Sequence, residues 1–245
     1  MDLYFIRHGQ SENNVLEGDP ALHHLRKADP NLTAIGYKQA EQLAIRLATQ
    51  PSTGSSRGPL FADSQNAQGF GITHLYCSLH LRAIQTAMPT CEALGLPLVA
   101  WKLAHEHWGL FQYDEQTDTY TAHPGPSRTY FAEHFPKLVL PEDVGEDGWW
   151  KGNREDDAAK NARAKAFYAE LLARHGATDD RIALVSHGGF FVSFMRAVFA
   201  TPYAEESNWF LMNNCAISRL HFSQRGPLLV YANNTQHLPY EYHTY

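Results

Sequence analysis

The sequence predicts an α/β fold: a single domain, residues 1–245, with a mostly parallel sheet, helices on both faces, and a long irregular insertion over one end of the sheet. The first indication is that short apolar runs of strand-forming residues alternate with longer segments whose apolar residues recur at helical spacing. The second is that two of these runs end in a histidine followed by a glycine. A hydrophobic content of 44% in 245 residues is enough for one large core.

The first strand is predicted at residues 3–6, and it stops at Arg7, His8 and a glycine. In an open α/β sheet, ligands bind just outside the carboxyl ends of the strands, so Arg7 and His8 lie where such a fold places chemistry. The run 181–185 ends in the same way at His187. Either histidine alone would be an ordinary strand-end residue, but the pair predicts two imidazoles that converge on one site.

Two helices are expected in the first half of the chain. Thr33 is a plausible N-cap for the first, which continues to residue 48 with a core-facing stripe that starts at Tyr37. Ser78 is interpreted as the N-cap of the second, and Pro89 inside its pattern is expected to kink or shorten it. The other expected elements are strands at 72–77, 98–101, 216–222 and 228–231 and helices at 158–175 and 190–199.

Two segments lack a regular pattern. Residues 51–71, rich in Ser, Gly, Gln and Pro, predict a surface loop to which no function is assigned. Residues 110–157 are irregular, and loops of this length are usually either functional lids or disordered. Their many aromatic residues argue against disorder, so we interpret the segment as an insertion that covers the site. Arg128, within it, is a candidate substrate contact.

Composition restricts the partners and the compartment. The 20 Lys and Arg against 26 Asp and Glu give a net charge of -6, which does not favour nucleic acid or an anionic membrane as a partner. No stretch is apolar and long enough to span a bilayer. Three cysteines without a CxxC pair argue against a disulfide framework or a structural zinc site and fit a reducing compartment. The first strand leaves no room for a signal peptide, so we expect a cytoplasmic protein. A homodimer is compatible with the sequence but is not specified by it.

Three further residues are candidates for the site. Arg82 is expected about one turn inside the second helix, where the helix N-terminus and a guanidinium fork both suit phosphate; a solvated helix-face charge is the alternative. Asn14 could offer its amide to an anion or occupy a turn. Glu106 stands between His105 and His107, and it could be a general acid or part of a metal-binding cluster. No partner stands at a familiar metal spacing nearby, so we expect no metal.

Gathered at the strand ends, two arginines, two histidines and a glutamate would supply what phosphoryl transfer needs: a nucleophile, charge stabilisation and a proton for the leaving group. Four segments of the chain resemble, in order, the motifs of the histidine phosphatase superfamily, the phosphoglycerate-mutase-like proteins. These segments are Arg7-His8-Gly9-Gln10-Ser11-Glu12 with Asn14, residues 32–40, residues 78–87, and Ser186-His187-Gly188-Gly189.

The resemblance implies metal-independent hydrolysis of a small phosphorylated substrate, with no cofactor. It implies that His8 attacks phosphorus and becomes a phosphohistidine. It also implies that Glu106 protonates the leaving oxygen and then activates water. The residues implied to hold the phosphorylated substrate are Arg7, Arg82, a protonated His187, Asn14 and Gly188.

The match departs from the family pattern at several positions. Gly109 follows Glu106 by three residues, where the family usually has four. Leu79 replaces a common proline, and Asn13 replaces the tryptophan that mutases usually carry. The alternative acids are Asp114, Glu115 and Glu133. The mutase signature is missing between residues 15 and 31, which favours a phosphatase. A phosphoglycerate-type mutase is the alternative, and a non-catalytic phospho-ligand-binding protein is less favoured.

Overall fold

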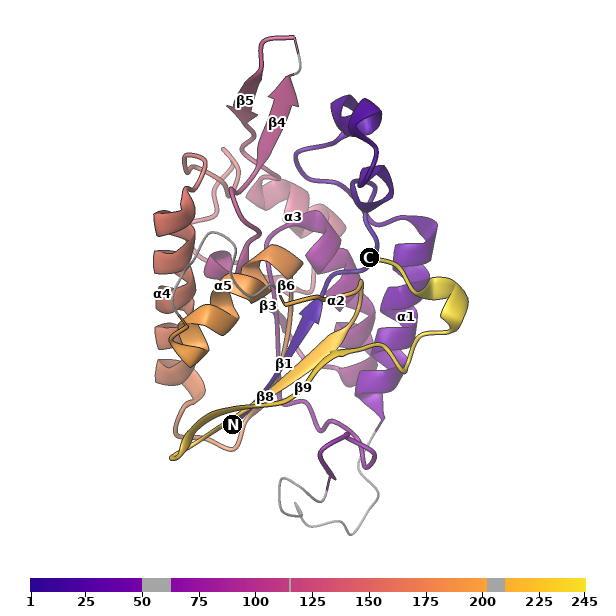
Figure 1. Cartoon of the computed structure of the whole chain (residues 1–245), viewed down its shortest axis with the longest axis vertical. Helices are drawn as coiled ribbons and strands as arrows, with labels where there is room; N and C mark the ends of the chain where they lie inside the picture. Colours follow the sequence, from indigo (N-terminus) through magenta and orange to yellow (C-terminus); the bar gives the residue numbers. More distant parts are fainter. Residues whose placement is uncertain (50–62, 115, 202–209) are drawn as a thin grey trace.

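The predicted strands assemble into one central sheet in this computed structural model, which describes residues 1–49, 63–114, 116–201 and 210–245 (Figure 1). The strand order is β6-β3-β2-β7-β1-β8-β9. The bounds are β1 Asp2–Arg7, β2 His74–Cys77, β3 Leu98–Ala100, β6 Leu138–Val139, β7 Arg181–Ser186, β8 Ile217–Ser223 and β9 Gly226–Asn234. Strands β6 to β1 run parallel, and β8 and β9 extend the sheet in antiparallel fashion. The predicted mostly parallel sheet is therefore confirmed.

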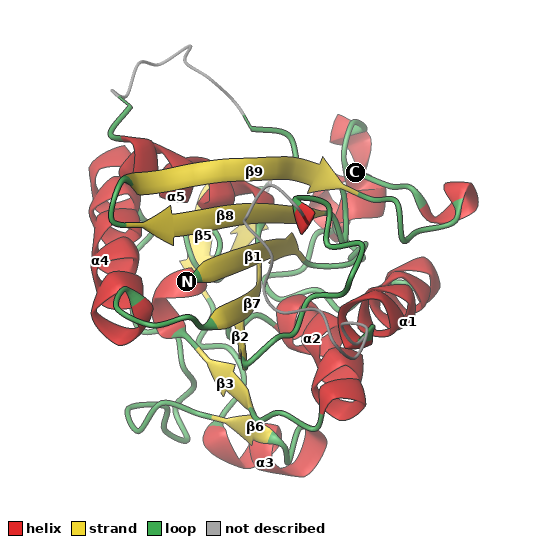
Figure 2. Cartoon of the chain, turned by 90° about the horizontal axis from the view of Figure 1, so that it is seen from below, coloured by secondary structure: helices red, strands yellow, loops and turns green. Residues whose placement is uncertain are grey.

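Helices cover both faces of the sheet, as predicted (Figure 2). Helices α1 (Ala34–Ala48) and α2 (Leu81–Leu94) lie on one face, and α4 (Asp157–His175) and α5 (Gly188–Phe199) lie on the other. Because strand side chains alternate between faces, Tyr4 and Ile6 of β1 join the α1–α2 core. Leu3 and Phe5 join the α4–α5 core. A strand that is buried on both faces has apolar residues at consecutive positions, so β1 could be predicted from its continuous apolar run.

Helix α1 begins where the sequence predicts, but α2 does not. The Thr33 hydroxyl accepts a hydrogen bond from the Gly36 backbone N–H at 3.1 Å, as an N-cap does. Helix α2 begins only at Leu81, so the predicted N-cap role of Ser78 is wrong. The Ser78 hydroxyl lies in the candidate site instead, where it contacts a histidine.

Two expectations about helix interiors also need correction. Pro89 lies inside α2, and the helix continues to Leu94, so the expected shortening is wrong, while the expected kink stays a prediction. Packing of α2 against α1 offsets the loss of one backbone hydrogen bond at Pro89. Tyr37, expected in the core-facing stripe of α1, is 44% exposed. The rest of that stripe is buried, from Ala40 to Leu47.

The described part of the predicted surface loop, residues 63–71, is packed into the protein. Phe70 is buried, and its ring lies 5.0 Å from the ring of Tyr4. The Asn66 amide donates to the Tyr4 hydroxyl at 2.8 Å. Residues 63–71 form a loop, as predicted, with residues 65, 67 and 68 exposed, but Asn66 and Phe70 are buried against the core. The first part of the predicted loop, 51–62, lies outside the described residues.

The segment 110–157 is more regular than the sequence suggests. It contains a hairpin of β4 (Phe111–Asp114) and β5 (Thr119–Ala122), helix α3 (Arg128–His134), and β6, which joins the central sheet. The hairpin rises above the carboxyl ends of the parallel strands, beside the connection after β1 (Figure 1). Buried Trp149 and Phe131 anchor the segment in the core, which accounts for its high aromatic content.

Short 3₁₀ helices complete the described chain: η1 Asn14–Leu16, η2 Pro20–Leu25, η4 Lys102–Ala104 and η5 Tyr240–Tyr242. Helices η1 and η2 belong to the connection after β1, and η4 follows β3. None of the helices built from described residues is both long and apolar enough to cross a membrane.

A buried arginine holds the connection after β3 against α4. Arg163 donates to both carboxylate oxygens of Glu155, each at 2.7 Å. It also donates to the backbone carbonyls of Leu103 and His105, each at 2.8 Å. The backbone immediately before Glu106 is therefore fixed by a side chain from the neighbouring helix.

Replacing Arg163 with Leu should lower the free energy of unfolding by about 3 kcal/mol, because it leaves the Glu155 carboxylate buried without its partner. Chemical denaturation monitored by circular dichroism measures the change. Lys137→Ala is the matched control, because its pair with Glu92 is exposed and should contribute no more than about 0.5 kcal/mol. Equal effects in the two variants would contradict the proposed anchoring.

Candidate active site

The pairing of β1 with β7 brings the two predicted histidines together. These strands are adjacent and parallel, with Arg7 opposite Ser186, so the residues that follow leave the sheet side by side. The ring centroids of His8 and His187 lie 5.2 Å apart. The His8 backbone N–H donates to the Ser186 carbonyl at 2.9 Å, which extends the pairing into the site.

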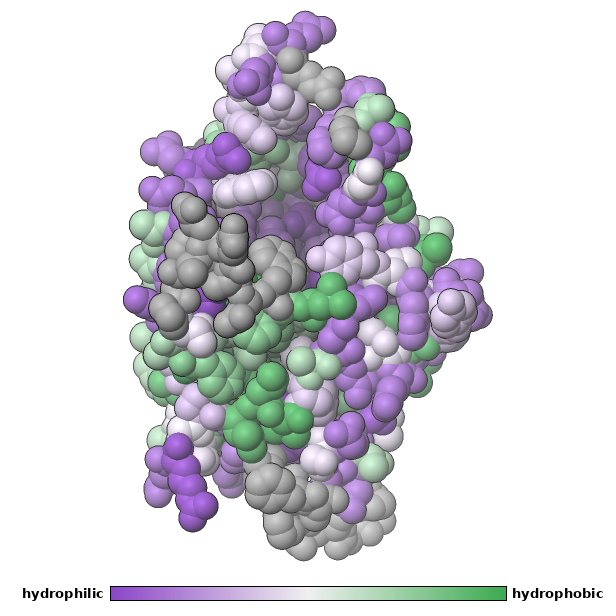
Figure 3. All heavy atoms as spheres, in the orientation of Figure 1, coloured by the Kyte–Doolittle hydropathy of each residue, from purple (hydrophilic) through white to green (hydrophobic). Residues whose placement is uncertain are grey.

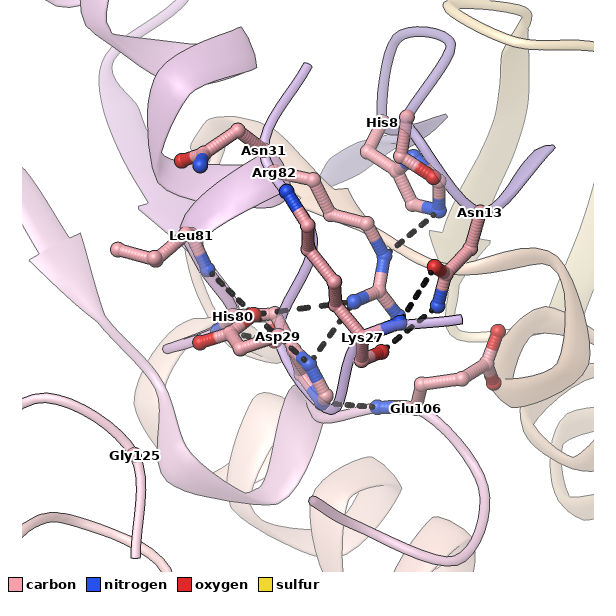
Figure 4. Close-up of polar contacts among 12 residues, drawn as sticks. His8, Asn13, Lys27, Asp29, Asn31, His80, Leu81, Arg82, Glu106 and Gly125 are labelled. Atoms are coloured by element: carbon pink, nitrogen blue, oxygen red, sulfur yellow. Dashed lines mark hydrogen bonds and ion pairs between the residues drawn. The ribbon is translucent and has the colours of Figure 1, made fainter. Parts of the chain in front are cut away.

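The hydrogen bonds of His8 define its tautomer. Its Nδ1 lies 2.7 Å from the Gly9 carbonyl oxygen, an acceptor only, so Nδ1 carries the proton. Its Nε2 accepts a hydrogen bond from Arg82 Nε at 3.1 Å (Figure 4). Burial, followed by the charges of Arg82 and Arg7, holds the pKa of His8 well below its usual value. His8 is therefore a neutral imidazole whose unprotonated Nε2 directs its lone pair toward Arg82.

His187 is also neutral in this arrangement. Its Nε2 lies 2.8 Å from the Ser78 hydroxyl, and its buried Nδ1 has no hydrogen-bond partner among the described residues. Burial, followed by the charges of Arg82 and His80, holds its pKa well below the usual value. The protonated state that the family resemblance implies is therefore not favoured by these residues alone. A nearby anion would favour it.

Arg7 brings a second guanidinium to the site. Its NH1 donates to the Met212 carbonyl, and its guanidinium carbon lies 4.7 Å from the centre of the Tyr245 ring. Its Nε is buried without a hydrogen-bond partner, and no carboxylate lies within 4.0 Å of it in the described chain. A buried cation without a counter-charge is costly, and an anion bound at this position would remove that cost.

Glu106 is held at the N-terminus of α5. Its carboxylate accepts hydrogen bonds from the backbone N–H groups of Gly189 at 3.2 Å, Phe190 at 2.9 Å and His107 at 2.8 Å. Burial acts to raise its pKa, but His107, these N–H groups and Arg82 outweigh burial and lower it. A Cβ atom at Gly189 would lie only 2.6 Å from Oε1, so only glycine leaves room for the carboxylate there.

Two residues of the site were not identified from the sequence. His80 Nδ1 lies 3.0 Å from Arg82 NH1, and the His80 ring centroid lies 4.6 Å from that of His187. Asp29 Oδ1 accepts from the Leu81 backbone N–H at 3.1 Å and lies 3.9 Å from Arg82 NH1 (Figure 4). Burial raises the pKa of Asp29 to about 7, although Arg82 opposes the shift.

These two residues differ in how far the sequence alone could have indicated them. His80 lies inside the segment that resembles the second arginine motif, so its position between Ser78 and Arg82 was a usable clue. Asp29 lies in an irregular loop, 53 residues before Arg82, and no pattern connects them.

The predicted substrate contacts Asn14, Gly188 and Arg128 have different surroundings. The Asn14 Oδ1 accepts from the backbone N–H and hydroxyl of Ser11, at 3.0 and 2.9 Å, so it shapes the loop after His8. Gly188 lies against Arg7, since a Cβ there would be 3.6 Å from its Nε. Arg128 instead donates to backbone carbonyls of residues 141, 142 and 144 within the insertion, so it is left out of the proposed site.

The alternative acids do not replace Glu106. Asp114 is exposed on β4 and accepts from the Gln116 backbone N–H, and Glu133 is exposed on α3. Glu115 lies outside the described residues. Of the acids considered, Glu106 is the one held beside Arg82 and the histidines.

His105 and His107 do not converge with Glu106 on a common point. His105 Nδ1 contacts the Glu106 backbone carbonyl, and His107 Nε2 lies 3.1 Å from the Ser193 hydroxyl. Within the described chain, the group spaced closely enough for a metal ion is His74, His175 and Asp180. It lies at the amino-terminal end of β2, the opposite end of the sheet from His8, and it already forms a hydrogen bond between His175 Nδ1 and Asp180 at 2.8 Å.

A pocket of about 600 Å³ adjoins these residues. Its lining includes His80, Arg82 and Glu106, together with residues of the connection after β1 and of the β4–β5 hairpin. The space-filling view shows a hollow with hydrophilic walls between these two segments (Figure 3). His8 is buried and does not line the pocket, so Arg82 stands between the pocket and His8 Nε2.

Comparisons with known proteins agree with this geometry. The chain matches a model of the histidine phosphatase superfamily (branch 1) over residues 3–59 and 62–235. No curated protein sequence matches it.

Several solved structures share its fold. A phosphoserine phosphatase from Entamoeba histolytica, in complex with phosphoserine, is 18% identical with a TM-score of 0.57, covering 97% of this chain and 99% of that one. The alpha-ribazole phosphatase from Shigella flexneri is 20% identical with a TM-score of 0.60, covering 96% of each chain. A mycobacterial glucosyl-3-phosphoglycerate phosphatase is 19% identical with a TM-score of 0.52, covering 89% of each. Since the family model spans most of the chain, the protein belongs to the histidine phosphatase superfamily (branch 1).

Proposed function

We propose that the protein is a metal-independent phosphomonoesterase that acts through a phosphohistidine at Nε2 of His8. The observation that carries this proposal is the neutral His8 imidazole, whose Nε2 lone pair faces the Arg82 guanidinium. Family membership supports it, as do structural neighbours described as phosphatases of small phosphorylated compounds.

In the first step, His8 Nε2 attacks phosphorus while the bond to the leaving oxygen breaks. Arg82 must exchange its hydrogen bond to Nε2 for bonds to phosphoryl oxygens, because it stands between the nucleophile and the pocket. Arg7 and Arg82 then balance the negative charge on those oxygens. The free Nδ1 of His187 offers a third donor once it is protonated.

Glu106 is the proposed acid and base. Its protonated form gives its proton to the leaving alkoxide, which departs as the alcohol. The resulting carboxylate then takes a proton from water, which attacks the phosphohistidine and releases inorganic phosphate and neutral His8. A bound phosphate dianion offsets the Arg82 charge that lowers the pKa of Glu106, and so favours the protonated form that the first step needs.

Hydrolysis is favoured over phosphate return to a second alcohol because the pocket opens to solvent. The hollow in Figure 3 has many hydrophilic residues in its lining, and Glu106 is one of them, so water can reach this carboxylate. A mutase would need to exclude water until the acceptor had reacted.

Replacing His8 with Ala should lower phosphate release from nitrophenyl phosphate by at least about a thousandfold, because the attacking atom is lost. The measurement is phosphate release with a chelator present. His221→Ala is the control, since His221 lies away from the site and pairs with Asp2. Wild-type protein quenched with ³²P-labelled substrate should retain label in alkali and lose it in acid, as a phosphohistidine does.

Undiminished release by the folded His8→Ala variant would exclude His8 as the nucleophile. Activity lost on chelation would contradict metal independence. Transfer of phosphate between phosphoglycerates, without release, would identify the alternative mutase.

Replacing Glu106 with Gln should lower kcat for an alkyl phosphate by about 10² to 10⁴-fold, because a poor leaving group needs the proton. Nitrophenyl phosphate, which leaves readily as an anion, should lose less than about tenfold. Glu133→Gln, a change at an exposed alternative acid, is the matched control. Equal losses on the two substrates would remove Glu106 as the proton donor.

Asp29 should give kcat/KM a dependence on pH near 7, the pKa to which burial raises this carboxyl. Below that pH Asp29 is neutral and Arg82 is free to bind phosphate; above it the carboxylate competes for Arg82, so kcat/KM should fall as pH rises. Asp29→Asn should remove this descending limb, while Asp143→Asn, an exposed pair with Lys102, should keep it. A limb unchanged in Asp29→Asn would assign it to another group.

A further inference from the structure

The pocket beyond the phosphoryl site has an aromatic wall. Trp108, Phe111, Tyr113 and Tyr120 all line it, and the last three come from the β4–β5 hairpin. Trp108 and Tyr120 are 49% and 45% exposed, so they present large ring surfaces that no protein core covers. Flat rings of this kind bind other flat rings by offset stacking.

The backbone of Trp108 is strained. Its φ of 71° lies in the left-handed region, which is unfavourable for a bulky side chain. Gly109 follows with φ of 84°, and a Cβ there would lie 2.0 Å from the Trp150 ring. The Trp150 ring therefore packs directly against the backbone of this turn and holds it in place. A strained conformation persists only where the surroundings enforce it, and here the result is a tryptophan held at the pocket wall.

The same pocket is lined by several cationic side chains. They are Arg26, Lys27, Arg82 and Arg154, and the lining contains one carboxylate, that of Glu106. The net charge of the whole chain is -6, so these cations are concentrated locally.

The acidic residues of the insertion do not oppose this charge. Asp143 pairs with Lys102, and Asp147 pairs with Lys151 at 2.8 Å, and none of the four lines the pocket. Among the described residues of segment 110–157, no carboxylate lines the pocket, so none there opposes a second anionic group on the substrate.

Arg154 is the cation best placed to receive such a charge. Arg26 lies 3.9 Å from Glu17, and Lys27 pairs with Glu12 at 2.7 Å. Arg154 instead lies 4.6 Å from the Trp108 ring centre and 4.1 Å from that of Tyr120, without a carboxylate within 4.0 Å in the described chain. Stacking uses the faces of a guanidinium and leaves its N–H edge for an acceptor.

From this arrangement we infer the substrate class: a small phosphomonoester whose alcohol half combines a flat aromatic or heteroaromatic ring with a second anionic group. The ring packs against the wall formed by Trp108 and the hairpin aromatics. The second anion, a carboxylate or a phosphate, binds the edge of Arg154. This inference rests on the proposed phosphatase function, because the phosphoryl group must occupy the site beside Arg82.

Three alkyl phosphates separate the two recognition elements: cyclohexylmethyl, benzyl and 4-carboxybenzyl phosphate. Their alcohols have similar basicity, so differences in kcat/KM report binding in the pocket rather than leaving-group chemistry. Wild-type kcat/KM should rise about threefold or more from the puckered to the flat ring. It should rise about tenfold more with the carboxylate, the size expected for a hydrogen bond to a charged group. Adenosine 5'-phosphate and adenosine 3',5'-bisphosphate repeat the second comparison with phosphate as the anion.

Arg154→Gln should reduce the ratio of kcat/KM for 4-carboxybenzyl over benzyl phosphate to near one. Trp108→Leu should reduce the ratio for benzyl over cyclohexylmethyl phosphate. Arg174→Gln is the matched control, because Arg174 also stacks on a tryptophan, at 4.1 Å from the Trp101 ring centre, but does not line the pocket. It should leave both ratios unchanged.

The outcomes distinguish this inference from the proposed function. Phosphate release from all three esters with both ratios within twofold of one would overturn the substrate class and leave the phosphatase intact. Ratios that Arg154→Gln and Trp108→Leu leave at wild-type values would also overturn it. No release from any ester, nor from nitrophenyl phosphate, would overturn the proposed function itself.

Discussion

The site depends on the parallel pairing of β1 with β7. Arg7 pairs with Ser186, and the residue that follows each of them is a histidine. The rings of His8 and His187 therefore lie close together where the two strands end. A slip of one residue would turn the apolar side chains of β1 to the wrong faces and separate the histidines. The double burial of this strand, with Phe5 on one side and Tyr4 on the other, therefore fixes the relative position of the two histidines.

The second constraint is charge. Arg7 and Arg82 are buried next to His8. Within the described chain, Asp29 is the carboxylate within 4.0 Å of Arg82, at 3.9 Å, and the charge of Glu106 also acts on Arg82. Burial, followed by the charge of Arg82, lowers the pKa of both imidazoles and keeps them neutral. Arg7 Nε and His187 Nδ1 have no hydrogen-bond partner in the described chain. Burying such groups costs stability, and a bound dianion would satisfy all of them at once. These groups lower the stability of the free protein, and a bound anion would offset that loss.

Much of the fold and the centre of the site could be predicted because they follow from local patterns. The apolar run before His8 and the repeat of that pattern before His187 identified adjacent strand ends. Other features depend on contacts between distant segments. Asp29 reaches Arg82 from an irregular loop, and Arg128 is occupied by backbone carbonyls of its own insertion. The predicted role of Ser78 was wrong for a similar reason. Its hydroxyl, which local sequence suggested would cap α2, instead contacts His187, 109 residues later in the chain.

The charge state of the site then couples binding to chemistry. With the protein groups alone, Glu106 is held as a carboxylate and His187 as a neutral ring, the opposite of what the proposed phosphoryl transfer to His8 requires. Burial has the largest effect on both pKa values, raising that of Glu106 and lowering that of His187. The charge of Arg82 lowers both of them, together with His107 in the case of Glu106. A dianion beside Arg82 weakens the pull of that cation on Glu106 and favours a proton on His187. The substrate would therefore bring about the protonation states that its own cleavage needs, and departing phosphate would restore the starting ones.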